Sequence, residues 1–242
     1  MQGYQQQPAY QPGTGRGTQL NTGVAQFMNG VYAWMTAGVA VTAAVAYGIS
    51  TSMAALLTFF NPHGGLTGLG WVVALAPIVL ILIFGSRMMN MSRGAATAIF
   101  MVLAVCYGVT FSIIPIAYAG VTIFKAFAAT MGMFAAMSLF GYVTKKDLSG
   151  IGQFLLMALF GVIIASIINA IFVQSQAAHM GIDILVVLIF AGLTAYDTQK
   201  LKQIYLVHGA VGNIAILGAL NLYLDFINIF ISLLHLFGGS RD

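Results

Sequence analysis

Seven stretches of this chain approach the roughly 20 consecutive apolar residues that a membrane-spanning helix requires. A helix of that length pairs its backbone N–H and C=O groups internally, which is the main condition for crossing lipid. The stretches therefore predict an all-α membrane protein, a bundle of seven transmembrane helices. The expected helices cover residues 28–50, 69–88, 94–115, 121–143, 151–174, 180–202 and 214–238.

The composition agrees with this class and excludes a soluble one. Of the 242 residues, 60% are hydrophobic and 6% are charged, whereas soluble domains carry about 25% charged residues. The chain has five aspartates and no glutamate. Its single cysteine, Cys106, leaves no pair for a disulfide or a CxxC metal site. The net charge of +4 reflects the loops of a membrane protein and does not indicate nucleic-acid binding.

Residues 1–26 differ from the rest of the chain, because they are rich in Gln, Gly, Pro, Tyr and Thr. Such a segment cannot bury enough apolar surface to fold by itself. We therefore expect a disordered N-terminal tail over residues 1–26, followed by one transmembrane domain over residues 27–242.

The basic residues predict the orientation of the bundle. Seven of them belong to the tail and to the second, fourth and sixth connections, and two lie on the opposite side. Positive charge marks the cytoplasmic side of a membrane protein, so we expect a cytoplasmic N-terminus and a C-terminus outside. The first group is Arg16, Arg87, Arg93, Lys145, Lys146, Lys200 and Lys202, and the second is Lys125 and Arg241.

The last predicted helix carries a carboxylate, Asp225, within the apolar segment "LNLYLDFINIF". An aspartate at the centre of a membrane helix costs roughly 2.5–3.5 kcal/mol on insertion scales, so Asp225 should face the bundle, with the last helix central. Polar residues recur along that face at spacings of three and four residues, which places them on one side of a helix. We interpret this stripe as the lining of a hydrated seam; hydrogen bonding between helices is the alternative. Its members are Asn221, Asp225, Asn228, Ser232 and His235.

The expected partner of Asp225 is Asp197, on the preceding helix. The turn between the two helices is predicted at residues 208–213, and Val211 lies fourteen residues after Asp197 and fourteen before Asp225. In an antiparallel hairpin, equal distance from the turn means equal depth. The two carboxylates therefore meet if the sixth helix continues past Lys202.

Two carboxylates in contact at a site of low dielectric constant do not both ionise cheaply, so the pair is expected to share a proton. With the proton bound, a hydrogen bond joins the two helices. Without it, two anions repel each other and form a site for a hard cation such as Ca²⁺. Two carboxylates and nearby Asn oxygens fall short of a tight cage, so Asp197 and Asp225 predict weak Ca²⁺ binding and a pH-dependent gate.

Two further charged residues belong to this sequence-based site. Arg87 ends the second predicted helix on the cytoplasmic side and is a candidate latch that pairs with the aspartates. An ordinary interfacial arginine is the alternative. Asp183, near the start of the sixth predicted helix, is interpreted as a helix-start residue.

The segments "AYDTQ" (195–199) and "NLYLDFINIF" (221–230) resemble the Bax inhibitor family of seven-helix membrane proteins, in its bacterial branch. The resemblance implies a pH-dependent Ca²⁺ leak with a di-aspartyl sensor, which falls on Asp197 and Asp225, and an arginine latch, which falls on Arg87. Some members carry a glutamate in the second helix, whereas this chain has Pro77 in that region and no glutamate. We expect a monomer in the bacterial inner (plasma) membrane, without enzymatic activity and without a cofactor.

Two other functions stay open at this point. An intramembrane aspartyl protease also places aspartates on adjacent helices, and its YD motif matches "AYD". Its GxGD motif has no counterpart, because Leu222, Tyr223 and Leu224 precede Asp225. The other function is that of a non-conducting modulator or substrate of the membrane protease FtsH, to which bacterial relatives are linked. The tail 1–26 would then be an unstructured handle.

Overall fold

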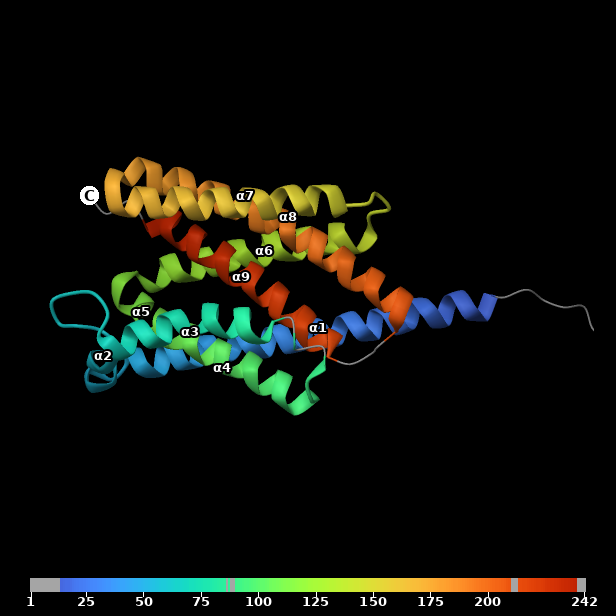
Figure 1. Cartoon of the computed structure of the whole chain (residues 1–242), viewed down its shortest axis with the longest axis horizontal. Coiled ribbons are helices and arrows are strands. Elements are labelled where there is room, and N and C mark those ends of the chain that lie inside the picture. Colours follow the sequence, from blue (N-terminus) through green and yellow to red (C-terminus); the bar gives the residue numbers. More distant parts are fainter. Residues whose placement is uncertain (1–13, 86, 88–89, 210–212, 239–242) are drawn as a thin grey trace, which may run out of the picture.

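The computed structural model describes residues 14–85, 87, 90–209 and 213–238, and these form a bundle of helices (Figure 1). In the described residues, extended pairing is limited to one isolated bridge between Phe60 and Leu66. The prediction of an all-α fold is confirmed. The helices are α1 (Thr14–Ser50), α2 (Met53–Phe59), α3 (Gly68–Phe84), α4 (Arg93–Phe111), α5 (Ile114–Ala117), α6 (Gly120–Val143), α7 (Ser149–Ile168) with its π-helical continuation Asn169–Val173, α8 (Gln176–His208) and α9 (Ile214–Gly238).

Within the described residues, six helical segments are long and apolar enough to cross a membrane, judged by length and composition. The remaining predicted span, residues 69–88, corresponds to α3, which has 17 residues and is shorter than these six. The chain is therefore a multi-pass membrane protein. The six segments are Thr22–Ser50, Arg93–Ala117, Gly120–Val143, Ser149–Val173, Gln176–His208 and Ile214–Gly238.

The last helix, α9, runs through the middle of the bundle and packs against α1, α4, α6 and α8 (red in Figure 1). Its side chains Leu222, Tyr223 and Ile229 have no exposed surface. Helices α3 and α7 instead expose large apolar side chains such as Leu82 and Phe160, as helices that face lipid do. This packing agrees with the expected central position of the last helix.

Two apolar clusters fix α9 in place. In the first, Tyr223 packs against Phe100 of α4 with ring centroids 5.6 Å apart, in an edge-to-face arrangement that aromatic pairs favour. In the second, Ile229 packs with Val187 and Phe190 of α8. The first cluster includes residues of α9 before and after Asp225, and the second continues from Ile229 toward the end of the helix, so the rotation of α9 at the aspartate is determined by both.

The N-terminal boundary differs from the prediction. Helix α1 begins at Thr14, so residues 14–26 are helical and the expected domain boundary at residue 27 falls inside a helix. Val24 and Phe27 are buried, and the Phe27 ring stacks on Tyr205 of α8 with centroids 4.9 Å apart. Tertiary contacts thus stabilise a helix that the local composition does not favour. Residues 1–13 of the expected tail lie outside the described residues.

Helix α8 is longer than predicted at both ends, because residues 180–202 were expected and it covers Gln176–His208. At its start, the Ser175 Oγ accepts a hydrogen bond of 3.3 Å from the Ala178 N–H, which is a favourable N-cap. At its end, the helix continues past Lys202, so the condition for the two aspartates to lie at equal depth is met. Helix α9 has the predicted bounds, and Val211 lies outside the described residues.

Candidate functional site

Asp225 lies in the middle of α9 and is 3% exposed. Its Oδ2 atom is buried and has no hydrogen-bond partner in the described part of the chain. A carboxylate oxygen in this position is costly unless something satisfies it. The surroundings of Asp225 therefore favour a proton, a cation or water at Oδ2.

Asp197 is half-buried on α8, which packs antiparallel to α9 (Figure 1). The charge of Asp197 acts on Asp225, so the two carboxylates lie within electrostatic range of each other. Lys200, in the next turn of α8, is positively charged and attracts the Asp197 carboxylate. The two aspartates are predicted to be neighbours because they are equally far from the turn. In the structure they lie close enough to interact electrostatically. Proton sharing and Ca²⁺ binding by the pair stay predictions.

A chain of hydroxyl groups holds α8 beside Asp197. The Oγ of Ser138, on α6, lies 3.0 Å from Thr198 Oγ1 and 2.5 Å from the hydroxyl of Tyr32, on α1. Thr198 directly follows Asp197, so these contacts fix the rotation of α8 at the aspartate. Tyr32 and Ser138 also line a pocket of about 500 Å³.

The next residue of the motif, Gln199, connects α8 to the loop between α6 and α7. Its Oε1 accepts a hydrogen bond of 2.9 Å from the Leu148 N–H, and its Nε2 donates one of 2.8 Å to the Lys146 carbonyl. Neither Thr198 nor Gln199 is predicted from the sequence to have a role. The signal that points to them is the run of consecutive polar side chains directly after Asp197.

The polar stripe of α9 divides into parts with different environments. Asn221 is half-buried, and Ser232 is buried. The Asn228 Nδ2 donates a hydrogen bond of 2.7 Å to the Leu224 carbonyl of its own helix, not to a neighbouring helix. His235, at the C-terminal end of the stripe, contacts α8 instead. The five residues therefore lie on one face of α9, but their side chains do not form one continuous set of contacts.

Arg87 is not brought to the aspartates. It is exposed in the turn after α3, and no ion pair joins it to Asp197 or Asp225 among the described residues. The physical reason is the position of α3, which packs against α2 and α4, at the edge of the bundle. The latch is therefore not formed in this structure, and its existence stays a prediction.

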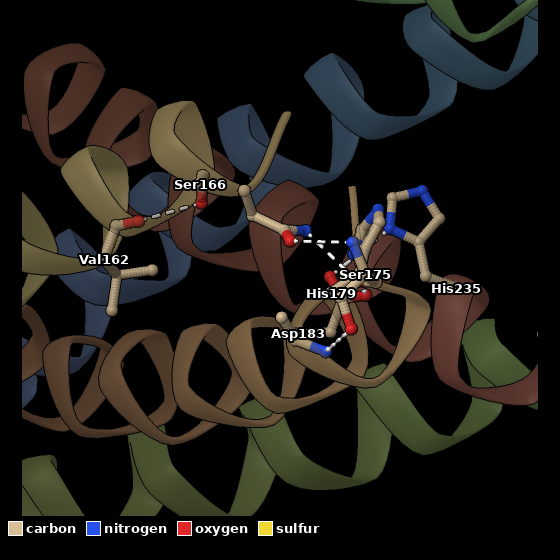
Figure 2. Close-up of polar contacts among 8 residues, drawn as sticks. Val162, Ser166, Ser175, His179, Asp183 and His235 are labelled. Atoms are coloured by element: carbon tan, nitrogen blue, oxygen red, sulfur yellow. Dashed lines mark hydrogen bonds and ion pairs between the residues drawn. The ribbon is translucent and has the colours of Figure 1, made fainter. Parts of the chain in front are cut away.

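A second polar cluster lies at the other end of α8 and α9 (Figure 2). The Nδ1 of His179 is 3.0 Å from Asp183 Oδ2, and the Nδ1 of His235 is 3.3 Å from Asp183 Oδ1. Asp183 is buried two turns after the first residue of α8, Gln176, so its interpretation as a helix-start residue is wrong. His179 is not among the site residues predicted from the sequence. The four-residue spacing of His179 and Asp183, which places both on one helix face, is the signal that reveals the pair.

Comparison with known proteins agrees with the resemblance carried by the two motifs. The profile of the family described as "Inhibitor of apoptosis-promoting Bax1" matches residues 24–242. The inner membrane protein YbhL of Escherichia coli K12 is 41% identical over 228 residues, which cover 92% of this chain and 95% of YbhL. Uncharacterized proteins of Caulobacter vibrioides and Deinococcus radiodurans are 41% and 42% identical, over 92% and 90% of this chain and 92% of each relative.

These similarities extend over the spans, the central helix and both aspartate motifs. Together with the six apolar segments, the similarity to YbhL identifies a multi-pass protein of the inner membrane. Because the family profile covers almost the whole chain, this protein belongs to the Bax inhibitor family.

Proposed function

We propose that this protein is a Ca²⁺-permeable leak channel whose conduction is controlled by the protonation of Asp197 and Asp225. The observation that carries the proposal is the buried Oδ2 of Asp225, which has no partner in the described residues and experiences the charge of Asp197. Ionisable groups inside a membrane are rare and mark ion pathways and proton relays. Two carboxylates that interact strongly take up and release protons as one unit.

The gate follows from the electrostatics of this pair. Two unit charges about 4 Å apart repel each other by about 4 kcal/mol at an effective dielectric constant of about 20. A shared proton removes this repulsion and holds α8 and α9 together. Loss of the proton favours either separation of the helices or entry of a cation, and oxygen ligands suit Ca²⁺. Because protons and Ca²⁺ compete for the same oxygens, conduction increases as the pH rises.

The basic connections support the proposed orientation, because the structure gathers them at one end of the bundle. Gln199 binds the carbonyl of Lys146, which places the lysines of α8 beside the loop between α6 and α7. The Asn213 Nδ2 donates a hydrogen bond of 2.7 Å to the Met91 carbonyl, which places the start of α9 beside the residues that precede α4. We assign this end to the cytoplasm, with the N-terminus, under the positive-inside rule.

The positions of the connections also support α3 as a seventh span. The C-terminal part of α1, with Ala46 and Tyr47, lines one pocket together with Ile114 and Pro115 of α5, at the end opposite the basic connections. The chain then returns to the basic end before α4 begins at Arg93, and α3 lies between. At about 1.5 Å per residue, a 17-residue helix covers about 25 Å of a hydrocarbon core of about 30 Å. Short flanking segments complete the crossing.

The packing around Asp225 supports a protein without peptidase activity. An aspartyl protease of the membrane has glycines three residues and one residue before one catalytic aspartate, whereas the fully buried Leu222 and the half-buried Leu224 occupy those positions. The Tyr223 hydroxyl lies 2.7 Å from Thr42 Oγ1, which joins α9 to α1 at this level. These side chains fill the space that an extended substrate needs next to Asp225.

Ca²⁺ uptake into proteoliposomes tests the proposal. At a fixed pH near 8, the wild-type protein should conduct, and Asp197→Asn and Asp225→Asn should each reduce the initial rate by about tenfold or more, because an amide carries no charge to attract a cation. The matched control is Asp147→Asn, which removes an exposed aspartate of a loop and should conduct like the wild type. Equal rates in the wild type, Asp197→Asn and Asp225→Asn would contradict the proposal.

A further inference from the structure

We propose that His179, Asp183 and His235 form a binding site for a divalent transition-metal ion, with Zn²⁺ as the ion that the ligands suit best. The site joins the first turns of α8 to the last turn of α9, at the end of the bundle opposite the basic connections (Figure 2). It is separate from the aspartate pair and does not depend on the proposed leak function.

The distances between the three side chains match a shared metal ion. The His179 Nδ1 lies 3.0 Å from Asp183 Oδ2, and the His235 Nδ1 lies 3.3 Å from Asp183 Oδ1. Two ligand atoms of a tetrahedral Zn²⁺ ion, each about 2.0–2.1 Å from the metal, are about 3.3 Å apart. One ligand atom from each of the three residues lies within 4.8 Å of the others. A small rotation of the two imidazoles closes the remaining gap.

The fold holds the three residues in this arrangement. His179 and Asp183 are four residues apart on α8 and therefore lie on one face. The first turn of α8 is fixed by Ser175, whose carbonyl accepts a hydrogen bond of 3.0 Å from the His179 N–H. Ser175 is held in turn by Asn169, whose Oδ1 accepts a hydrogen bond of 3.1 Å from the Ser175 N–H. His235 comes from the well-packed end of α9, next to the buried Leu234.

The charges around the cluster also favour a cation. Asp183 is buried, with 9% of its side chain exposed, and a carboxylate in that position requires a counter-charge. None of the described residues that line the surrounding pocket is a lysine or an arginine. The two histidines provide neutral imidazole ligands when they are unprotonated. A divalent ion would supply the missing positive charge between them.

The ligand set distinguishes this site from a Ca²⁺ site. Imidazole nitrogen suits Zn²⁺, Cu²⁺, Ni²⁺ and Fe²⁺, whereas Ca²⁺ takes six to eight oxygen ligands. Two imidazoles and one carboxylate leave at least one coordination position open, as in catalytic zinc sites. The three side chains line a pocket of about 810 Å³, together with Tyr118, Gln176 and Met180. Water or a small anionic ligand can therefore complete the coordination.

Tyr118 lines the same pocket as Asp183. Burial raises the pKa of the Tyr118 phenol, and the nearby Asp183 carboxylate raises it further. Tyr118 lies in the connection between α5 and α6, outside the spanning segments. The pocket therefore combines a carboxylate, two imidazoles and a neutral phenol, which is a polar site in an otherwise apolar bundle.

Zn²⁺ binding to the full-length protein, purified in detergent without a polyhistidine tag, tests this inference. Isothermal titration calorimetry should show one Zn²⁺ per chain. His179→Gln and His235→Gln should each weaken Zn²⁺ binding by about a hundredfold, because loss of a residue that only supports a metal ligand already weakens metal binding by about 10- to 100-fold. His63→Gln and His208→Gln remove exposed histidines of the chain and are the matched controls. They should leave the affinity unchanged. Ca²⁺ in hundredfold excess should not displace Zn²⁺.

A second measurement keeps the test independent of the variants' folding. In the wild-type protein, stoichiometric Zn²⁺ should raise the midpoint of thermal unfolding, because the ion links α8 to α9 and binds only the folded chain. The same addition should have no effect on Asp183→Asn. The inference is wrong if the wild-type protein shows neither stoichiometric binding nor thermal stabilisation. It is also wrong if His63→Gln or His208→Gln removes the binding and the two cluster variants do not.

Discussion

Gly141 of α6 and Ala195 of α8 lie so close together that a Cβ atom at position 141 would overlap the Ala195 carbonyl oxygen. Small residues at such crossings allow two membrane helices to pack backbone to backbone. Ala195 precedes Asp197 by two residues, so this contact sets how closely α6 approaches the aspartate. Ser138 lies one turn before Gly141 on α6. Its hydrogen bond to Thr198 of α8 therefore depends on the close approach of the two helices at Gly141.

Replacing Gly141 with alanine should therefore destabilise the protein by about 1–3 kcal/mol, the usual cost of overpacking where the backbone has to move. Gly132→Ala is the matched control on the same helix, because a Cβ atom there meets nothing within 4 Å. It should be neutral or slightly stabilising, since alanine favours helix more than glycine does. Reversible unfolding in mixed micelles measures both. Equal stability of the two variants would show that α6 and α8 do not pack at Gly141.

The hydroxyl chain between α1, α6 and α8 gives a second prediction. Ser138→Ala removes the group that bridges Tyr32 and Thr198, and it should reduce the free energy of unfolding by about 1 kcal/mol. Ser166→Ala is the control, because the Ser166 Oγ donates only to the Val162 carbonyl of its own helix in the described structure (Figure 2). A loss in Ser166→Ala as large as in Ser138→Ala would argue against a bridging role for Ser138.

Much of the bundle follows from the sequence, because length and hydropathy determine where helices cross a membrane. The bounds of α9 follow from the position of one turn, and the same position predicts that Asp197 and Asp225 lie close enough to interact. The helical residues 14–26 do not follow, because their stability comes from the contact of Phe27 with Tyr205, far along the chain. The cluster around Asp183 does not follow for a similar reason, since its side chains come from two helices and α8 begins earlier than its hydropathy indicates.

The contact between α1 and α8 gives a third prediction. Phe27→Ala removes a buried ring that stacks on Tyr205 and should destabilise the local structure by about 3 kcal/mol. Amide hydrogen exchange should then become about a hundredfold faster or more in residues 14–26, since each 1.4 kcal/mol is a factor of ten. Phe124→Ala, which truncates an exposed ring on α6, should leave this exchange unchanged. Fast exchange of residues 14–26 already in the wild type would contradict the helical extension.

The ionisation of Tyr118 gives a fourth prediction. Its phenol should ionise above the ordinary range of tyrosine, because burial and the Asp183 charge both disfavour the phenolate. Asp183→Asn should lower this pKa, although burial still keeps it above that of an exposed tyrosine. Nuclear magnetic resonance of ring-labelled tyrosine, with Tyr118→Phe to assign the signal, measures it. An unchanged pKa in Asp183→Asn would show that the carboxylate does not face the pocket.

The pH dependence of Ca²⁺ flux tests the central claim most directly. Initial rates in proteoliposomes should be compared for the wild type, Asp197→Asn, Asp225→Asn and the exposed control Asp147→Asn between about pH 6 and pH 8, where a coupled carboxylate pair in a membrane can exchange its shared proton. We expect the rate to rise with pH in the wild type and in Asp147→Asn, and to be low and independent of pH in the other two. The same pH response in all four proteins would contradict the account.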